Sequence, residues 1–173
     1  MRIITPTAVL RDWTLADARG LAQHADNPRV AACMRDGFPS PYTQEDAVRF
    51  ISFATTPGRH LLLAIEVDGE AVGGIGVHPL EDVYYQTGEI GYWLAEPCWG
   101  RGIATDALRA LVPIAFGEMG LVRLEAGVFS NNPASMRVLE QNGFVCEAVH
   151  RRAITKHGRL LDEVVFARLN PDA

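Results

Sequence analysis

Two glycines stand directly before a predicted helix in the segment Trp99-Gly100-Arg101-Gly102-Ile103-Ala104-Thr105. The first turn of a helix exposes unpaired backbone N–H groups and the positive end of the helix dipole, which together favour an anion. Glycine lets the backbone adopt unusual dihedral angles and approach a phosphate closely, and Arg101 adds a positive charge. The segment therefore predicts a phosphate-binding turn, although glycine turns also join strands to helices where no ligand binds.

Two common kinds of phosphate site do not fit this segment. The Walker pattern requires Gly-Lys-Ser/Thr, and this tripeptide occurs nowhere in the chain. The dinucleotide-binding fingerprint requires a third glycine where this sequence has Thr105, and an acidic residue that closes the next strand. The nearest acidic candidate, Glu125, falls inside its predicted strand. A nicotinamide-dependent oxidoreductase is therefore disfavoured.

The elements that would position this turn follow from hydrophobic periodicity and from helix and turn signals. Strands are predicted at residues 7–11, 60–67, 71–78, 89–94, 123–128, 145–154 and 160–169, helices at 14–25, 43–56, 102–119 and 132–142, and a loop at 26–42. The strand at 123–128 has a helix on either side, so it is predicted to pair parallel to the strand at 89–94. The predicted fold class is α+β, one domain over residues 1–173, with a mixed central sheet of about seven strands and helices on both faces.

The helix at residues 132–142 has clear start and stop signals. Asn132 is the predicted cap, and Pro133 takes the first helical position, where its missing N–H costs nothing. Gly143 is the predicted left-handed stop, and Phe144 is predicted to pack back against Leu139. In the preceding helix, Pro113 should cost a backbone hydrogen bond and produce a kink.

The glycine turn resembles the Q/R-x-x-G-x-G/A pyrophosphate loop of the GNAT N-acetyltransferases. Further matches follow in the family's order: Gly88-Glu89-Ile90-Gly91-Tyr92-Trp93-Leu94, Asn132-Pro133-Ala134-Ser135, Val138-Leu139-Glu140, Gly143-Phe144 and Asp162. This ordered set resembles the branch that contains the ribosomal-protein N-terminal acetyltransferases, and the order of elements fits from Val9 to Leu169. Trp99 departs from the usual Gln or Arg, which puts little in doubt because backbone amides do most of the phosphate binding in this family.

The resemblance implies acetyl-CoA as the co-substrate and no metal. The pyrophosphate would lie on the turn formed by Trp99, Gly100, Arg101, Gly102, Ile103, Ala104 and Thr105. The strands at 89–94 and 123–128 would separate near Leu94-Ala95, and the pantetheine arm would lie between them like an extra strand, beside Leu94. Asn132 matches the asparagine that steadies this arm in the family, although helix capping independently explains it.

Direct attack of an amine on a thioester requires a neutral amine, a polarised acetyl carbonyl and a proton for the departing thiolate. The first candidate base is Glu89, which begins a strand of Ile, Tyr, Trp and Leu residues, where removal from water would make its carboxylate more basic. A solvated carboxylate at a strand end is the alternative explanation. Glu125 on the adjacent strand is the second candidate, and His78 is the third.

The thiolate needs an acid near the start of the helix at residues 132–142. Many GNAT enzymes place a tyrosine five residues before the phenylalanine of the Gly-Phe pair, where this sequence has Leu139. Ser135 lies one helical turn earlier on the same face, and a serine occupies this place in the ribosomal-protein branch. Ser135 is therefore the candidate acid, with an ordinary first-turn serine and protonation by water as the alternatives.

The acceptor end of the site is predicted within residues 26–42, 81–86 and 155–159, where GNAT proteins differ. Four aromatic residues there either line an acceptor pocket or cover the core: Phe38, Tyr42, Tyr84 and Tyr85. The one basic cluster consists of His150, Arg151, Arg152, Lys156 and Arg159. It is predicted to be a solvated hairpin face, with contact to the 3′-phosphate of coenzyme A as the alternative.

Composition narrows the class of protein. Apolar residues make up 48% and charged residues 21%, as in globular proteins with a core. The net charge of −5 disfavours a nucleic-acid partner, and no apolar run reaches the ~20 residues of a membrane span, so a cytoplasmic location without a membrane partner is expected. The expected acceptor is a primary amine of a peptide N-terminus or a small molecule, and a homodimer is left open. The alternative function is a non-catalytic acetyl-CoA sensor or partner-binding module on the same fold.

Overall fold

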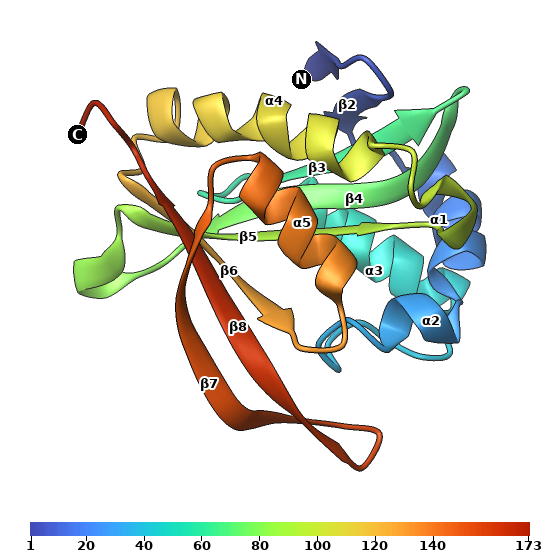
Figure 1. Cartoon of the computed structure of the whole chain (residues 1–173). Coiled ribbons are helices and arrows are strands. Elements are labelled where there is room, and N and C mark those ends of the chain that lie inside the picture. The colour runs from blue at the N-terminus through green and yellow to red at the C-terminus, as the bar shows by residue number, and fades with distance from the viewer.

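Eight strands form one mixed sheet in the computed structural model, which describes residues 1–173 (Figure 1). The strands are β1 (Arg2–Ile4), β2 (Val9–Asp12), β3 (Leu61–Val67), β4 (Glu70–Pro79), β5 (Thr87–Leu94), β6 (Arg123–Phe129), β7 (Val145–Lys156) and β8 (Arg159–Leu169). Their order across the sheet is β1-β2-β3-β4-β5-β6-β8-β7. All seven predicted strands are present, and the short β1 adds an eighth. β5 and β6 form the one parallel pair, as predicted.

Five helices accompany the sheet: α1 (Ala18–Ala25), α2 (Pro28–Ala31), α3 (Gln44–Ala54), α4 (Ile103–Gly117) and α5 (Pro133–Gln141). None of them is long and apolar enough to cross a membrane. The prediction of a loop over residues 26–42 is wrong for α2. The Asn27 side chain accepts a hydrogen bond from the Arg29 backbone N–H at 2.8 Å, and Pro28 takes the first helical position. These two signals start a helix even though the segment is rich in proline.

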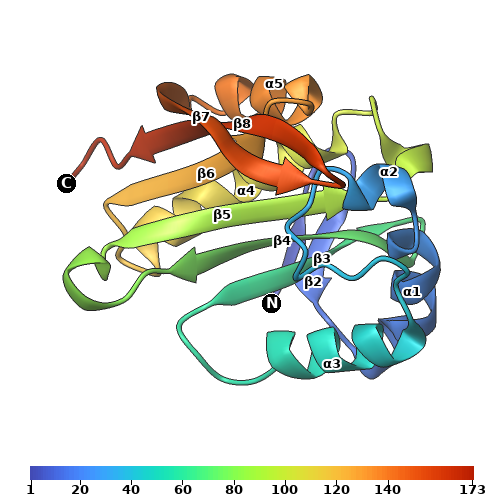
Figure 2. The same ribbon diagram turned by 90° about the horizontal axis from the view of Figure 1, so that it is seen from below.

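Each face of the sheet packs its own hydrophobic core. α4 and α5 cover the upper face of Figure 1, where Leu108, Leu111 and Leu124 are fully buried. α1 and α3 cover part of the lower face, where Leu21 and Ile51 are buried. Figure 2 views the molecule from below and shows the middle of β5, β6 and β8 without a helix across it. The lower face therefore keeps an open area beside its two helices.

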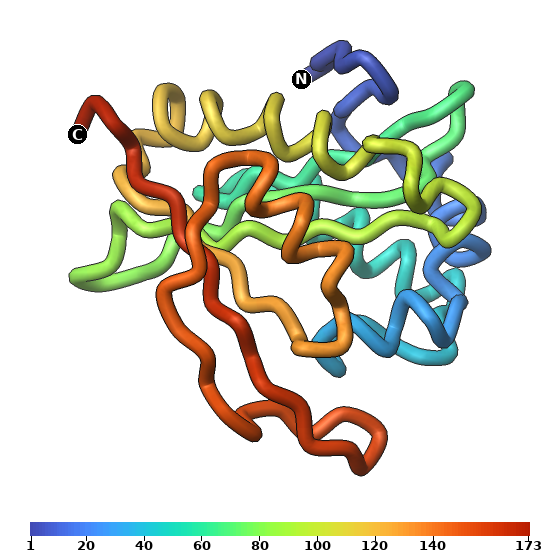
Figure 3. The backbone as a smooth tube through the Cα atoms, in the orientation of Figure 1, coloured from blue at the N-terminus to red at the C-terminus, as the bar shows by residue number.

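The end signals predicted for α5, which the backbone tube of Figure 3 shows between β6 and β7, are confirmed. The Asn132 side-chain oxygen accepts a hydrogen bond from the Ser135 backbone N–H at 3.2 Å. At the other end Gly143 has φ 75°, and the Phe144 N–H donates to the Leu139 carbonyl at 3.1 Å. This is a Schellman closure, and it buries both apolar side chains. In α4 the helix continues past Pro113, which is exposed.

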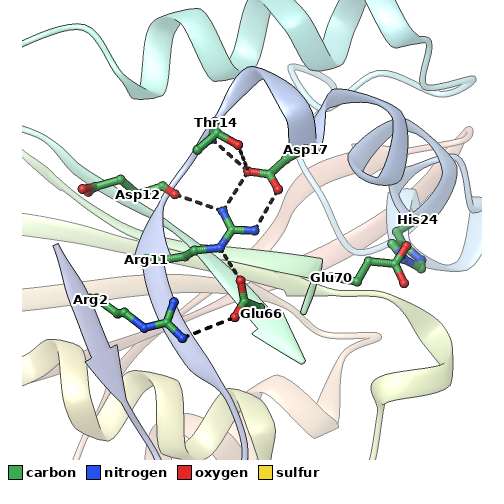
Figure 4. A network of polar contacts seen from close by, with 8 residues as sticks. All are labelled: Arg2, Arg11, Asp12, Thr14, Asp17, His24, Glu66 and Glu70. Atoms are coloured by element: carbon green, nitrogen blue, oxygen red, sulfur yellow. Dashed lines mark hydrogen bonds and ion pairs between the residues drawn. The ribbon is translucent and has the colours of Figure 1, made fainter. Parts of the chain in front are cut away.

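A partly buried ion-pair network joins β2, β3 and the turn before α1 (Figure 4). Both Nη atoms of Arg11 donate to the Asp17 carboxylate at 2.8 Å, and Nε of Arg11 donates to Glu66. The Thr14 backbone N–H also donates to Asp17, at 2.8 Å. Burial alone would raise the pKa of Asp17, but the hydrogen bonds from Arg11 and Thr14 outweigh it, so this pKa lies below its ordinary value.

We expect Asp17→Asn to lower the free energy of unfolding at pH 7 by about 2 kcal/mol, because it leaves the partly buried Arg11 short of a charged partner. A carboxylate with a depressed pKa stabilises the fold above its unfolded-state pKa of about 4, and this stabilisation is lost as the pH falls through the folded-state pKa. Urea unfolding should therefore give a difference that is full at pH 7 and shrinks below pH 4. The exposed Asp172→Asn is the control. A difference that is independent of pH would contradict this account.

Candidate active site

The parallel pairing of β5 with β6 stops after three residues of each strand. The register pairs are Thr87 with Arg123, Gly88 with Leu124 and Glu89 with Glu125. Beyond these pairs β5 continues to Leu94 against β4, and β6 continues to Phe129 against β8, without pairing to each other. The sheet therefore opens earlier along β5 than the predicted separation near Leu94-Ala95. We call this opening the strand split. The backbone N–H and C=O groups along its two facing edges have no strand partner.

The glycine turn follows β5 at the open end of the strand split (Figure 1). Gly100 has φ 71° and Gly102 has φ 78°, both in the left-handed region that favours glycine. Gly102 is the N-cap of α4, and its carbonyl accepts the hydrogen bond of the Asp106 N–H at 3.0 Å. A Cβ atom on either glycine would meet nothing within 4 Å, so the space in front of the turn is open. The first-turn N–H groups of residues 103–105 have no partner within the helix.

Trp99, the atypical first residue of the turn, holds the turn against β5. Its indole N–H donates to the Leu94 carbonyl at 2.8 Å. The guanidinium of Arg29 in α2 lies 5.3 Å from the ring centroid and also pairs with Glu96. The Leu94 side chain is buried in the upper core, so its predicted part in cofactor binding rests on its backbone. The exposed neighbour Arg101 remains free to add charge at the turn.

Thr105 connects the start of α4 to the end of α5. Its hydroxyl donates to Gln141 Oε1 at 3.1 Å, and its carbonyl accepts from Asn142 Nδ2 at 3.2 Å. Asn142 is only 4% exposed and also donates to the Val138 carbonyl at 2.8 Å. Sequence reasoning missed Asn142, whose signal is a polar residue at the closely packed end of α5. These contacts hold the end of α5 against the first turn of α4, which follows the glycine turn.

A hydrogen bond joins β5 to the start of α5 on the upper face. The phenol oxygen of Tyr92 lies 2.8 Å from Ser135 Oγ, and it donates to the Ser135 backbone oxygen at 3.2 Å. Burial raises the pKa of Tyr92 to about 12, against a smaller lowering by the Ser135 hydrogen bond. Sequence reasoning did not single out Tyr92, although the alternation of Ile90, Tyr92 and Leu94 places all three on the face that α4 and α5 cover.

The three predicted bases lie in one row on the lower face, at the closed end of the strand split. The register pairs His78 with Glu89, and Glu89 with Glu125. Glu89 is only partly removed from water: its side chain is 31% exposed and pairs with Arg35. The reason is that no helix covers this part of the lower face (Figure 2). Glu125 is paired with Arg123 at 3.2 Å.

His78 lies in a group of rings with Phe53 of α3 and His60, the residue before β3. Its centroid lies 6.5 Å from that of Phe53 and 6.2 Å from that of His60. Partial burial lowers the pKa of His78, and the His60 ring lowers it further, while Glu89 opposes both effects. The imidazole is therefore mainly neutral at pH 7, with a nitrogen that can accept a proton.

The loop after α2 connects β5 to the tip of the β7–β8 hairpin. Arg35 pairs with Glu89, and the next residue, Asp36, accepts a hydrogen bond from Lys156 Nζ at 2.7 Å. The Lys156 side chain is only 7% exposed, so its predicted place in a solvated basic face is wrong. The hydrogen bond and the charge of Lys156 lower the pKa of Asp36. The other members of the basic cluster are exposed: His150, Arg151, Arg152 and Arg159.

The four aromatic residues of the predicted acceptor segments divide into two groups. The ring centroid of Phe38 lies 5.0 Å from that of Tyr42 and 5.6 Å from that of Trp93. Phe38 and Tyr42 therefore cover the lower core. Tyr84 and Tyr85 are 63% and 55% exposed in the β4–β5 connection. Two of the four therefore belong to the lower core, and the other two face solvent.

Comparison with known sequences accounts for this arrangement. The sequence model of the acetyltransferase (GNAT) domain matches residues 8–145. The chain belongs to the GNAT family of acetyltransferases. The protein named "Probable N-acetyltransferase YjcK" of Bacillus subtilis (strain 168) is 41% identical over 105 residues, 61% of this chain and 58% of that protein. The ribosomal-protein-serine acetyltransferase of Escherichia coli (strain K12) is 32% identical over 102 residues, 59% of this chain and 56% of that protein.

This GNAT chain spans a little over half the length of these two curated relatives. Among solved structures, Mycobacterium smegmatis RimJ in complex with CoA-disulfide superposes with a TM-score of 0.86 at 26% identity. That similarity covers 99% of this chain and 87% of the other. The chain is therefore a member of the GNAT family with homologues among the ribosomal-protein acetyltransferases.

We expect Asp36→Asn to raise the amide hydrogen-exchange rates of residues 32–43 about tenfold. The loop loses its ion pair to the hairpin, and the covered Lys156 ammonium loses its partner. Hydrogen exchange followed by mass spectrometry measures this effect. Arg151→Ala, an exposed change on the same hairpin, should leave the exchange rates unchanged. Equal rates in Asp36→Asn and wild type would show that the Lys156 contact does not hold the loop.

Proposed function

We propose that this GNAT enzyme transfers the acetyl group of acetyl-CoA to a primary amine by direct attack, with the N-terminal amine of a protein or peptide as the preferred acceptor. The observation that carries the proposal is the strand split, which runs from Glu89 to the glycine turn before α4. The split offers free backbone edges to an extended arm that contains amide groups. The turn at its end offers an anion site to a pyrophosphate.

In this proposal the backbone holds acetyl-CoA more than the side chains do. The left-handed Gly100 and Gly102 leave open space before the first turn of α4. The N–H groups of residues 103–105 take the pyrophosphate there, and Arg101 adds charge. The pantetheine arm pairs with the edges of the strand split as an additional strand would. Trp99, Thr105 and Asn132 contribute by holding the turn and the start of α5 in place.

The amine approaches from the lower face, where the open area exposes the row of His78, Glu89 and Glu125. An amine at pH 7 arrives mainly as an ammonium ion, which can replace Arg35 as the partner of Glu89. Glu89 is the proposed base that then accepts the proton, directly or through one water molecule. His78, mainly neutral, and Glu125 are the alternative acceptors of this proton.

Attack of the neutral amine forms a tetrahedral intermediate, and its collapse breaks the bond between the acetyl carbon and sulfur. The electron pair goes to sulfur, which needs a proton to leave as a thiol. Ser135, on the upper face at the start of α5, is the proposed donor, and water is the alternative. The base and the acid thus act from opposite faces of the same sheet.

Two observations support a protein or peptide terminus as the acceptor. The homologues include a ribosomal-protein-serine acetyltransferase, and the open area carries the carboxylates of Glu89 and Glu125, which suit a cationic terminus. A small-molecule amine is the alternative acceptor. The cytoplasmic location and the homodimer stay predictions.

The test is release of free coenzyme A from acetyl-CoA in the presence of an acceptor panel. The panel contains N-terminal peptides beginning with serine or alanine, a polyamine, free amino acids and an aminoglycoside. Turnover that is fastest with the peptides supports the proposal in full. Turnover with a small amine alone keeps the reaction and corrects the acceptor. Binding of acetyl-CoA without turnover across the panel would identify a sensor instead of an enzyme.

We expect Gly102→Val to weaken acetyl-CoA binding at least tenfold in calorimetry. A β-branched residue cannot adopt the φ of 78° without strain, and its side chain would occupy the open space before the helix. Gly69→Val is a matched control, because Gly69 has φ 84° and equally open space but lies in the distant β3–β4 turn. If both variants bind acetyl-CoA as wild type does, the glycine turn does not form the pyrophosphate site.

We expect Glu89→Gln to reduce kcat by about 100-fold or more and to remove the acid limb of the pH–rate profile, which is the usual scale of losing a general base. Glu118→Gln, an exposed carboxylate at the end of α4, should have no effect. A Glu89→Gln enzyme with the wild-type rate and profile would make Glu89 a structural partner of Arg35. Glu125→Gln would then be the next variant to measure.

A further inference from the structure

The Ser135 hydroxyl has a neighbour from another element of the fold. Ser135 is the third residue of α5, and its backbone N–H is already used by the Asn132 cap. Tyr92 reaches this position from β5, with its phenol oxygen 2.8 Å from Ser135 Oγ. The Tyr92 ring is packed against the upper core, which fixes the position of the phenol oxygen.

A serine in the first turn of a helix has competing hydrogen-bond partners. Its hydroxyl can rotate among three staggered positions and can bond to carbonyl groups of the preceding turn. A phenol that donates to Ser135 Oγ occupies an oxygen lone pair and leaves the serine hydrogen available for another acceptor. Because the phenol is held by β5, this hydrogen bond also selects one rotamer of Ser135.

We propose that Tyr92 is a positioning residue that orients the Ser135 hydroxyl for proton transfer to the departing sulfur of coenzyme A. The inference rests on the proposed function. In the collapse step the bond between carbon and sulfur breaks and its electron pair goes to sulfur. Ser135 gives its hydroxyl proton to sulfur and takes the surplus proton of the attacking nitrogen, so Ser135 is restored and the step is balanced. In this step the single hydroxyl hydrogen of Tyr92 is directed to Ser135 Oγ, the nearer of its two acceptors, and Tyr92 keeps its own proton.

The surroundings of Tyr92 suit this part. Burial raises the pKa of Tyr92 to about 12, so the phenol keeps its proton and remains a donor across the working pH range. Its second contact, to the Ser135 backbone oxygen at 3.2 Å, keeps the ring end against the first turn of α5. The hydrogen bond thereby connects the wall of the strand split formed by β5 to the helix that carries the acid.

The test is a double-mutant cycle on the single-turnover rate of acetyl transfer to the best acceptor of the panel. We expect Tyr92→Phe to slow this rate about tenfold, the size of one hydrogen bond, with acetyl-CoA affinity within twofold of wild type. Ser135→Ala should slow it at least as much. The double variant should be no slower than Ser135→Ala, because Tyr92 acts only through Ser135. Tyr42→Phe is the matched control, a buried tyrosine of the lower core, and should keep the wild-type rate.

Two results would overturn the inference while acetyl transfer itself stands. One is a double variant whose rate loss equals the product of the two single losses. That result is expected if Tyr92 only supports the fold and does not act through Ser135. The other is a full rate in Tyr92→Phe or in Ser135→Ala. Absence of turnover by wild type with every amine is a different failure, since it removes the proposed function and this inference with it. If Tyr92→Phe does not fold, as judged by circular dichroism, Tyr92→Met takes its place in the cycle, because methionine fills the space without a hydroxyl.

Discussion

Backbone groups on the facing edges of β5 and β6 lose their strand partners after Glu89 and Glu125, and the rest of the site depends on this loss. Unpaired N–H and C=O groups inside a sheet are costly unless water or a ligand satisfies them. The opening persists because each strand is fully paired on its outer edge, β5 with β4 as far as Leu94 and β6 with β8 as far as Phe129. An extended ligand with amide groups can satisfy these edges where no neighbouring strand does.

The two faces of the sheet around this opening differ in what covers them. The upper face is covered by α4 and α5, which bring the glycine turn and Ser135 to it, and the close packing there fixes their geometry. The lower face is half covered by α1 and α3 and leaves the row of His78, Glu89 and Glu125 accessible. An acetyl donor and an amine acceptor that enter from opposite faces can meet within the sheet, where neither blocks the path of the other.

Sequence patterns predicted the parts of this molecule that depend on local chemistry. The caps of α5, the glycine turn and the parallel strand pair follow from residue types at short spacing, and the structure contains all of them. The patterns failed where partners come from distant segments. The carboxylate of Glu89 is paired with Arg35, the ammonium of Lys156 is covered through Asp36, and Tyr92 reaches Ser135 across 43 positions of the chain. Nothing in the spacing of these residues indicates that they meet, because tertiary packing decides it.

Helix α2 has only four residues, yet the helix and the loop after it contact both the glycine turn and Glu89. Arg29 lies against Trp99 and Glu96 at the glycine turn, and the loop that leaves the helix carries Arg35 to Glu89. A shift of this helix when the amine displaces Arg35 would therefore change the setting of the turn as well. Thermodynamic linkage makes any such coupling reciprocal: acetyl-CoA would alter the affinity for the amine by the same factor by which the amine alters the affinity for acetyl-CoA.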